Sequence, residues 1–273
     1  MLTREMIKKI KHIEIRSSRM VEEIFSGEYH SGFKGKGMEF QDIREYYAGD
    51  DIRNIDWNVT ARHNKAFVKQ FCEERQLNMF LLIDMSKSNC FSNKKEIIAE
   101  ISATLALSAN KNKDKIGAML FTDKIEKFIP SKNGKKHVLS IIEHILTLNP
   151  KSQNTDISCV LKHFIRTQKK RSIVFIISDF LDEGYDRELK ILSSKHELVM
   201  VRVVDKGEER IPSGAIFTFE DLETGKTIVL DNIKNQYSQN NSLKMYKKNM
   251  IEIYTDEDYY KPLKQFFKRR DFK

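Results

Sequence analysis

Residues 77–90 of the chain read LNMFLLIDMSKSNC, and this stretch decides the fold. Its first part is almost continuously apolar, which is typical of a strand buried on both faces of a parallel sheet. The apolar run ends in the carboxylate of Asp84, and hydroxyl side chains follow at Ser86 and Ser88. Three interpretations are open: a nucleophile, a metal site built from oxygen ligands, or a polar loop whose serines cap the next helix.

Strand-like apolar segments alternate with helix-like segments from this point onward. Strand patterns recur at residues 172–179, 197–205 and 251–256, and helical spacing of apolar residues occurs at 94–110 and 135–148. Strands that alternate with helices are joined by crossover connections. The sequence therefore predicts an α/β protein with a doubly wound, mostly parallel sheet.

A second carboxylate ends another of these strands. The segment SIVFIISD, at residues 172–179, closes on Asp179 just as residues 77–84 close on Asp84. In open parallel sheets, ligands bind in the crevice beyond the carboxyl ends of the strands. We therefore expect both aspartates to lie in the same crevice region.

The chain divides by pattern into two parts. Residues 1–75 combine an N-terminal helix with a charged segment that holds the only tryptophan, Trp57. Residues 76–273 are predicted to form the sheet domain. Within it, a turn signal at Thr224 and Gly225 predicts a hairpin inserted at about 211–235.

Composition narrows the class of protein. Forty per cent of the 273 residues are hydrophobic, which is enough for a substantial core, and no apolar run approaches the ~20 residues of a membrane span. No signal-peptide pattern is seen at the N-terminus, and the three cysteines form no paired motif, so we expect a cytoplasmic protein. The net charge of +9 is dispersed over many short basic runs, which makes nucleic-acid binding a minor alternative.

The residues after the first strand suit a hard cation. One carboxylate and two hydroxyls, from Asp84, Ser86 and Ser88, converge if the loop curls, and Asp179 and Thr155 offer further oxygen ligands. Oxygen ligands suit Mg²⁺ and do not suit zinc or copper, which prefer imidazole or thiolate. From the first motif alone, the capping interpretation of the serines is favoured.

The D-M-S-K-S motif resembles the D-x-S-x-S signature of von Willebrand factor A domains. The metal-ion-dependent adhesion site of those domains adds a later threonine and a later aspartate, and Thr155 and Asp179 follow in that order. The resemblance implies the corresponding fold and one divalent cation, Mg²⁺ or Mn²⁺, held partly through water. Its ligands would be Asp84, Ser86, Ser88, Thr155 and Asp179. The chain departs from the pattern at Gln153 and Asn154, where glycine is frequent, and Lys87 lies inside the motif.

A longer stretch resembles a bacterial family. GKGMEFQDIREYYAGDDIRNIDWNVTAR, at residues 35–62, is similar to the signature of the family called domain of unknown function fifty-eight, and the later SDFLDE follows in family order. Genes of that family often lie beside one for a MoxR-type AAA+ ATPase. The resemblance implies an accessory protein that works with such an ATPase.

The charged segment around the tryptophan has two interpretations. Its residues of interest are Arg44, Asp50, Asp51, Arg53, Asp56, Trp57 and Arg62. The favoured interpretation is a structural ion-pair network with Trp57 as its apolar anchor. The other is a docking surface, because Arg, Tyr and Trp are enriched at interface centres.

The expected function is that of a non-enzymatic, metal-ion-dependent protein-binding adaptor. It would act with a MoxR-type ATPase in assembly or maturation of protein complexes. The first alternative is a metal-dependent hydrolase or phosphatase in the same pocket. Phosphatases of the haloacid-dehalogenase type carry a D-x-D pattern, and Ser86 stands where they have the second aspartate. The chain has neither a G-x-S-x-G elbow nor a phosphate loop, so no catalytic constellation is complete. The second alternative is a basic nucleic-acid-binding protein.

Overall fold

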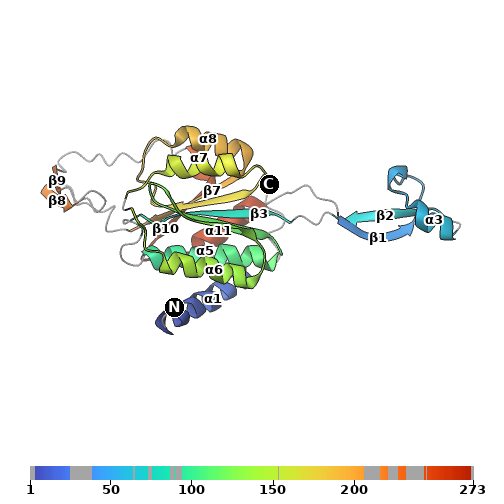
Figure 1. Cartoon of the computed structure of the whole chain (residues 1–273), viewed down its shortest axis with the longest axis horizontal. Helices are drawn as coiled ribbons and strands as arrows, with labels where there is room; N and C mark the ends of the chain where they lie inside the picture. The colour runs from blue at the N-terminus through green and yellow to red at the C-terminus, as the bar shows by residue number, and fades with distance from the viewer. Residues whose placement is uncertain are drawn as a thin grey trace. The chain divides into compact units, whose positions relative to one another are not determined.

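The computed structural model comprises two compact units, Met1–Gly32 together with Leu77–Lys273, and Phe33–Gln76. Each unit is described by itself (Figure 1). The residues that the structure describes are 4–24, 39–63, 65–72, 76–86, 89, 94–152, 154–205, 216–220, 227–231, 243 and 245–271.

A six-stranded sheet forms the centre of the first unit. Its strands lie in the order β10-β7-β6-β3-β4-β5. Every neighbouring pair is parallel except β4 and β5, which pair antiparallel at one edge. The strands are β3 (Asn78–Asp84), β4 (Lys115–Phe121), β5 (Ile125–Lys132), β6 (Ile173–Ser178), β7 (Glu197–Val204) and β10 (Met250–Tyr254). The predicted doubly wound, mostly parallel sheet is confirmed.

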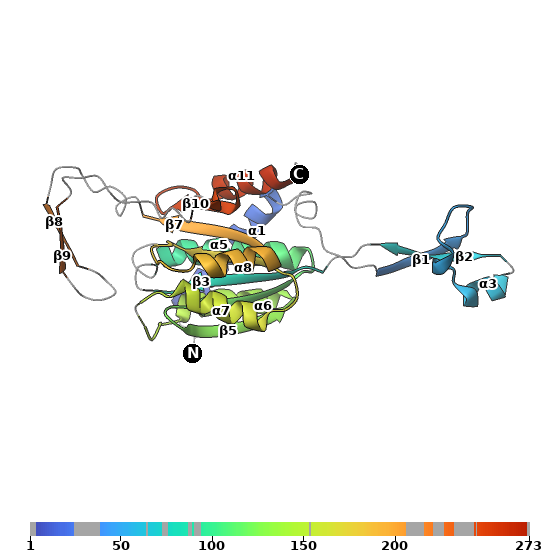
Figure 2. The same ribbon diagram turned by 90° about the horizontal axis from the view of Figure 1, so that it is seen from above.

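Helices cover both faces of this sheet (Figure 1). On one side lie α5 (Lys94–Lys111), α6 (Lys135–Thr147) and α1 (Arg4–Ile24), and on the other lie α7 (Ile157–Thr167) and α8 (Asp186–Lys195). The last helix, α11 (Tyr260–Asp271), lies beside β10 and α1 (Figure 2). Because both faces are covered, β3 and β6 are buried along almost their whole length, as their continuous apolar runs require.

Helix α1 belongs with the sheet. It packs mainly against α5, its Ile13 and Val21 are buried, and Arg16 forms a 2.9 Å ion pair with Glu100 of α5. The compact units therefore differ from the predicted division into 1–75 and 76–273. The apolar stripe of α1 is covered by a helix far away in the chain, and no local pattern identifies that partner.

The second unit is small. β1 (Glu39–Glu45) pairs antiparallel with β2 (Phe67–Cys72), and between them lie the short helix η1 (Ile52–Asn54) and α3 (Trp57–His63). The backbone N–H of Asp56 donates to the carbonyl of Phe67 at 2.8 Å, which fastens the start of α3 to β2.

Two further strands lie within the segment for which an inserted hairpin is predicted. β8 (Ile216–Glu220) and β9 (Thr227–Asp231) pair antiparallel with each other. Among the described residues, no helix combines the length and the apolar character that a membrane span needs.

Candidate metal centre

Asp84 and Ser178 meet at the carboxyl edge of the sheet. β3 and β6 are neighbours with Ile83 opposite Ile177, so the next residues, Asp84 and Ser178, come side by side. The Ser178 hydroxyl donates a 2.7 Å hydrogen bond to Oδ2 of Asp84, and the backbone N–H of Ser86 donates to Oδ1 at 2.9 Å. The Asp84 side chain is fully buried, so these two bonds replace water.

Asp179 follows Ser178 directly and is 5% exposed. Its Oδ1 accepts a 3.3 Å hydrogen bond from the N–H of Leu181, whereas its buried Oδ2 has no hydrogen-bond partner among the described residues. The chain turns sharply here because Phe180 has a φ of +57°, in the left-handed region that non-glycine residues seldom adopt. This turn holds the Asp179 carboxylate at the carboxyl end of β6.

A buried lysine that the sequence did not indicate lies beside the Asp179 carboxylate. Lys94, the first residue of α5, is 1% exposed, and its Nζ lies 3.8 Å from Oδ2 of Asp179. This distance is that of an ion pair and is too long for a hydrogen bond. Local sequence carries no signal for this contact, because a lysine at the start of a helix is usually solvated.

The two carboxylates influence each other. The pKa of Asp84 is raised to about 7, mainly by burial and secondly by the negative charge of Asp179. Hydrogen bonds from Ser86 and Ser178 oppose this rise, because they stabilise the ionised form. Burial also raises the pKa of the nearby Tyr185, helped by the charges of surrounding aspartates.

The loop that carries Thr155 is tied to the same edge. The N–H of Asp156 donates to the carbonyl of Thr122 just beyond β4, at 3.1 Å. Asp156 then caps α7 by accepting a 2.8 Å bond from Cys159 N–H, and Asp182 accepts a 2.8 Å bond from Ile157 N–H. The half-buried Thr155 therefore lies where the ends of β4 and β6 meet the start of α7.

Of the five predicted ligands, Asp84, Ser86 and Asp179 are buried at this edge, and Thr155 lies in the adjoining loop. Ser88, like Lys87 and Gln153, lies outside the described residues. The structure adds Ser178, which its place directly before Asp179 on a neighbouring strand could have indicated, and Asn89, whose Nδ2 donates to Ser86 Oγ at 3.3 Å.

These residues fit a hard divalent cation. In the described part of the chain no three His, Cys, Asp or Glu side chains gather, so the set is limited to two carboxylates and hydroxyls. Such ligands suit Mg²⁺, which keeps several waters and binds one or two carboxylates. The buried Oδ2 of Asp179, with its unused acceptor capacity, is the observation that favours a cation here.

The charged segment forms local ion pairs. Arg44 binds Asp50 with two 2.7 Å hydrogen bonds, Arg53 lies 3.2 Å from Asp51, and Asp56 caps α3 through Asn58 N–H at 3.0 Å. Hydrogen bonding and the opposite charge lower the pKa of Asp50 and of Asp51.

Trp57 is not an apolar anchor for this segment. Its side chain is 69% exposed, and Tyr47 and Ile52 are each 67% exposed. The exposed Arg62 forms no ion pair with the described residues. The ion pairs order the segment without burying its tryptophan.

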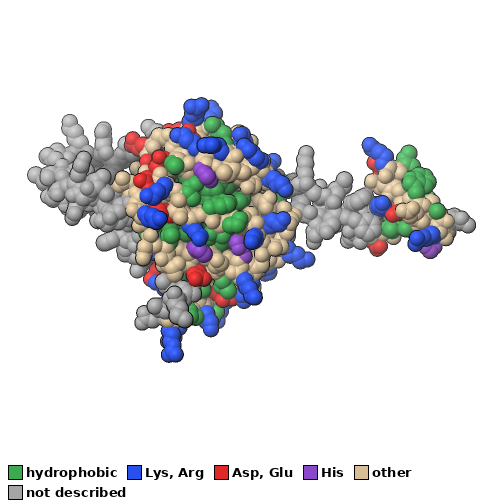
Figure 3. Space-filling view, in the orientation of Figure 1, with side chains coloured by type: hydrophobic (Ala, Val, Ile, Leu, Met, Phe, Trp, Pro, Cys, Tyr) green, Lys and Arg blue, Asp and Glu red, His purple; other side chains and the backbone are tan. Residues whose placement is uncertain are grey.

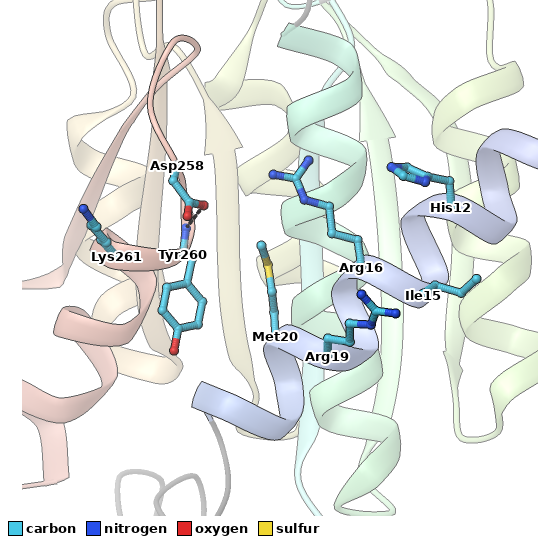
Figure 4. A pocket seen from close by; sticks show the side chains of 8 residues that line it. All are labelled: His12, Ile15, Arg16, Arg19, Met20, Asp258, Tyr260 and Lys261. Atoms are coloured by element: carbon cyan, nitrogen blue, oxygen red, sulfur yellow. Dashed lines mark hydrogen bonds between the residues drawn. The ribbon is translucent and has the colours of Figure 1, made fainter.

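A groove between α1 and α11 is lined by none of the predicted ligands (Figure 4). Its volume is about 540 Å³. Arg16 and Arg19 line it from α1, while Tyr260 and Lys261 line it from the start of α11. The groove is open, and the positive charges of Arg16, Arg19 and Lys261 outnumber the single carboxylate of Asp258 in its lining, which disfavours a cation there.

Comparison with known proteins yields relatives of undescribed activity. The uncharacterized protein Mb1516 of Mycobacterium bovis is 25% identical over 223 residues, covering 79% of this chain and 70% of that protein. The uncharacterized protein YeaD of Bacillus subtilis is 28% identical over 103 residues, covering 38% of this chain and 25% of that protein.

Among solved structures, the conserved hypothetical protein BatB from Bacteroides thetaiotaomicron has a TM-score of 0.48 at 14% identity. The match covers 72% of this chain and all of that chain. The family model described as "Protein of unknown function DUF58" matches residues 42–248, which is more than half of the chain, so the protein belongs to that family.

Proposed function

We propose that the protein is a non-enzymatic, protein-binding adaptor that holds Mg²⁺ or Mn²⁺ at the carboxyl ends of β3 and β6. The ligands would be Asp84, Ser86, Ser88, Thr155 and Asp179, some of them through water. The observation that carries this proposal is the pair of buried carboxylates at the ends of β3 and β6, of which Asp179 keeps an acceptor atom without a hydrogen bond among the described residues.

A cation at this place would bind a partner. The hydroxyls of its shell are neutral and some ligands act only through water, so little negative charge lies in direct contact with the metal. The cation then stays electrophilic, and a carboxylate from outside can complete an octahedral shell. Association bridged by the metal follows from this ligand set.

The second unit supplies a surface suited to the same role. Trp57, Tyr47 and Ile52 are large apolar side chains left in solvent, and aromatic residues of this kind dominate the energetics of interfaces. We propose that this surface contacts the protein partner. A MoxR-type AAA+ ATPase is the candidate partner, on the strength of the family resemblance alone.

A hydrolase in the same pocket is the alternative function. The pKa of about 7 for Asp84 favours it, because a general base works best when its pKa lies near the operating pH. Against it, Asp84 is fully buried and both its oxygens already accept hydrogen bonds. Phosphatase turnover that depends on Asp84 would support this alternative.

Nucleic-acid binding receives less support. On the face shown in Figure 3, Lys and Arg side chains are scattered among acidic and apolar ones and form no continuous stripe. A footprint for a phosphate backbone would gather the basic residues on one face. Steep salt dependence of binding to generic DNA would revive this alternative.

The metal site is tested by thermal unfolding with Mg²⁺ and Mn²⁺. A cation that binds the folded state raises the free energy of unfolding by about 2.7 kcal/mol at a hundred times its Kd. We expect a rise in melting temperature for the wild type and none for Asp84→Asn. Asp114→Asn is the matched control, because Asp114 is also fully buried but precedes β4 at the opposite edge of the sheet. An equal rise in wild type and Asp84→Asn would contradict the proposal.

The partner is tested by co-precipitation of the MoxR-type ATPase with this protein, in Mg²⁺ and in EDTA. We expect recovery in Mg²⁺ only, and loss of recovery for Asp84→Asn. Recovery that is unaffected by EDTA would show that partner binding does not need the metal.

A further inference from the structure

The side chain of Lys94 ends beside the candidate metal centre. This side chain is 2% exposed, and its Nζ lies 3.8 Å from the same Asp179 Oδ2 that has no hydrogen-bond partner among the described residues. Lysine is almost never fully buried unless it is paired. The ammonium is therefore held next to the oxygen that a divalent cation would use.

The formal charges of the site show what this ammonium changes. Asp84 and Asp179 contribute −2 when ionised, and Lys94 contributes +1. Counted over these three side chains alone, a divalent cation brings the total to +1, an excess of positive charge around the Asp179 carboxylate. A single carboxylate from a partner restores neutrality. Uncompensated charge in a buried site is strongly unfavourable.

Without the lysine, the balance differs. Two aspartates and one divalent cation are already neutral, and a partner carboxylate would then add an unwanted negative charge. The lysine thus shifts the neutral state from the metal-loaded protein to the complex of metal, protein and outside carboxylate.

We propose that Lys94 couples cation binding to carboxylate binding. Its ammonium weakens binding of the cation to the isolated protein. The same ammonium favours binding of the cation once an outside carboxylate enters the shell. This inference rests on the proposed metal site and its outside carboxylate, and it adds the role of Lys94. The centre would bind metal and acidic partner together and hold either one alone weakly.

The test is calorimetric titration of Mg²⁺ into the full chain, in chloride and in acetate at equal ionic strength. Acetate serves as the carboxylate probe. A pH of about 8 keeps Asp84 ionised, since its pKa is about 7. For the wild type we expect weak binding in chloride and a Kd lower by about tenfold or more in acetate, equivalent to about 1.4 kcal/mol.

Lys94→Met removes the charge and keeps the length of the side chain. We expect it to bind Mg²⁺ at least about tenfold more tightly than the wild type in chloride, with little gain from acetate. Lys94→Arg keeps the charge and should retain the gain from acetate. Lys95→Met is the matched control, because Lys95 donates to the carbonyl of Leu148 and should behave as the wild type.

The outcomes separate the two proposals. If all variants bind Mg²⁺ but Lys94→Met binds no more tightly than the wild type, or gains as much from acetate, the coupling by Lys94 is wrong and the metal site stands. If no variant binds Mg²⁺ in either salt, the metal site itself is wrong. Circular dichroism checks whether Lys94→Met folds. If it does not, Lys94→Gln provides the same comparison.

Discussion

The hydroxyl of Ser178 donates a 2.7 Å hydrogen bond to Oδ2 of Asp84, a residue 94 positions earlier in the chain. The same Oγ accepts a 3.1 Å bond from the N–H of Phe180, which has the left-handed φ of +57°. One serine therefore supports both the carboxylate at the end of β3 and the turn that positions Asp179 after β6.

Ser178→Ala should destabilise the protein by about 1–3 kcal/mol, because it leaves a buried carboxylate oxygen without its donor. The pKa of Asp84 should rise further, since the lost bond stabilises the ionised form. Urea unfolding measures the free-energy change. Ser194→Ala is the control, because Ser194 is exposed and its hydroxyl donates to the carbonyl of Ile191 within its own helix. An equal loss in both variants would contradict the role of Ser178.

Asp84 should make the metal-free protein less stable as the pH rises. Its pKa is raised from 3.8 in the unfolded reference to about 7 in the fold, so between these values the folded state binds more protons than the unfolded state. The free energy of unfolding therefore falls as the pH rises through this window, and the loss is complete above about pH 7.

The comparison with Asp84→Asn isolates this effect from other titrating groups. In EDTA, the stability of the wild type relative to Asp84→Asn should fall from about pH 4 to about pH 7 and stay level above it. Urea unfolding across this range measures the difference. A difference that is independent of pH would show that the carboxyl does not titrate there.

Gly117→Ala should destabilise the sheet by about 1–3 kcal/mol, the usual cost of overpacking. A Cβ at position 117 of β4 would lie 2.5 Å from Cε1 of the buried Phe80 on β3 and 3.0 Å from the carbonyl oxygen of Ile129 on β5. The double variant Gly117→Ala, Phe80→Leu should lose less than the sum of the single variants, because the smaller side chain makes room. If the losses of the two single variants simply add in the double variant, the contact with Phe80 is not the source of the strain.

Trp57→Ala should change stability by no more than about 0.5 kcal/mol, because the side chain is 69% exposed. It should nevertheless reduce recovery of the partner in the co-precipitation assay. Asn58→Ala, at the exposed neighbouring position of α3, should change neither. A large loss of stability in Trp57→Ala would instead show that the tryptophan is structural.

The sequence by itself determined the layers of the fold and the edge that carries the carboxylates. A strand buried on both faces must be apolar along its length, so β3 and β6 are visible as continuous runs, and each run is followed by an aspartate. The carboxyl ends of parallel strands share one edge, which is why Asp84 and Asp179 could be placed together.

Tertiary structure alone decided which other groups join them. Ser178 contacts Asp84 because β3 and β6 are neighbours in a fixed register, and register is set by packing over the whole sheet. Lys94 is buried because the first residue of α5 lies at the same edge, and no local pattern distinguishes it from a solvated lysine. Trp57 is 69% exposed because its small unit has too little apolar surface to cover a side chain of this size.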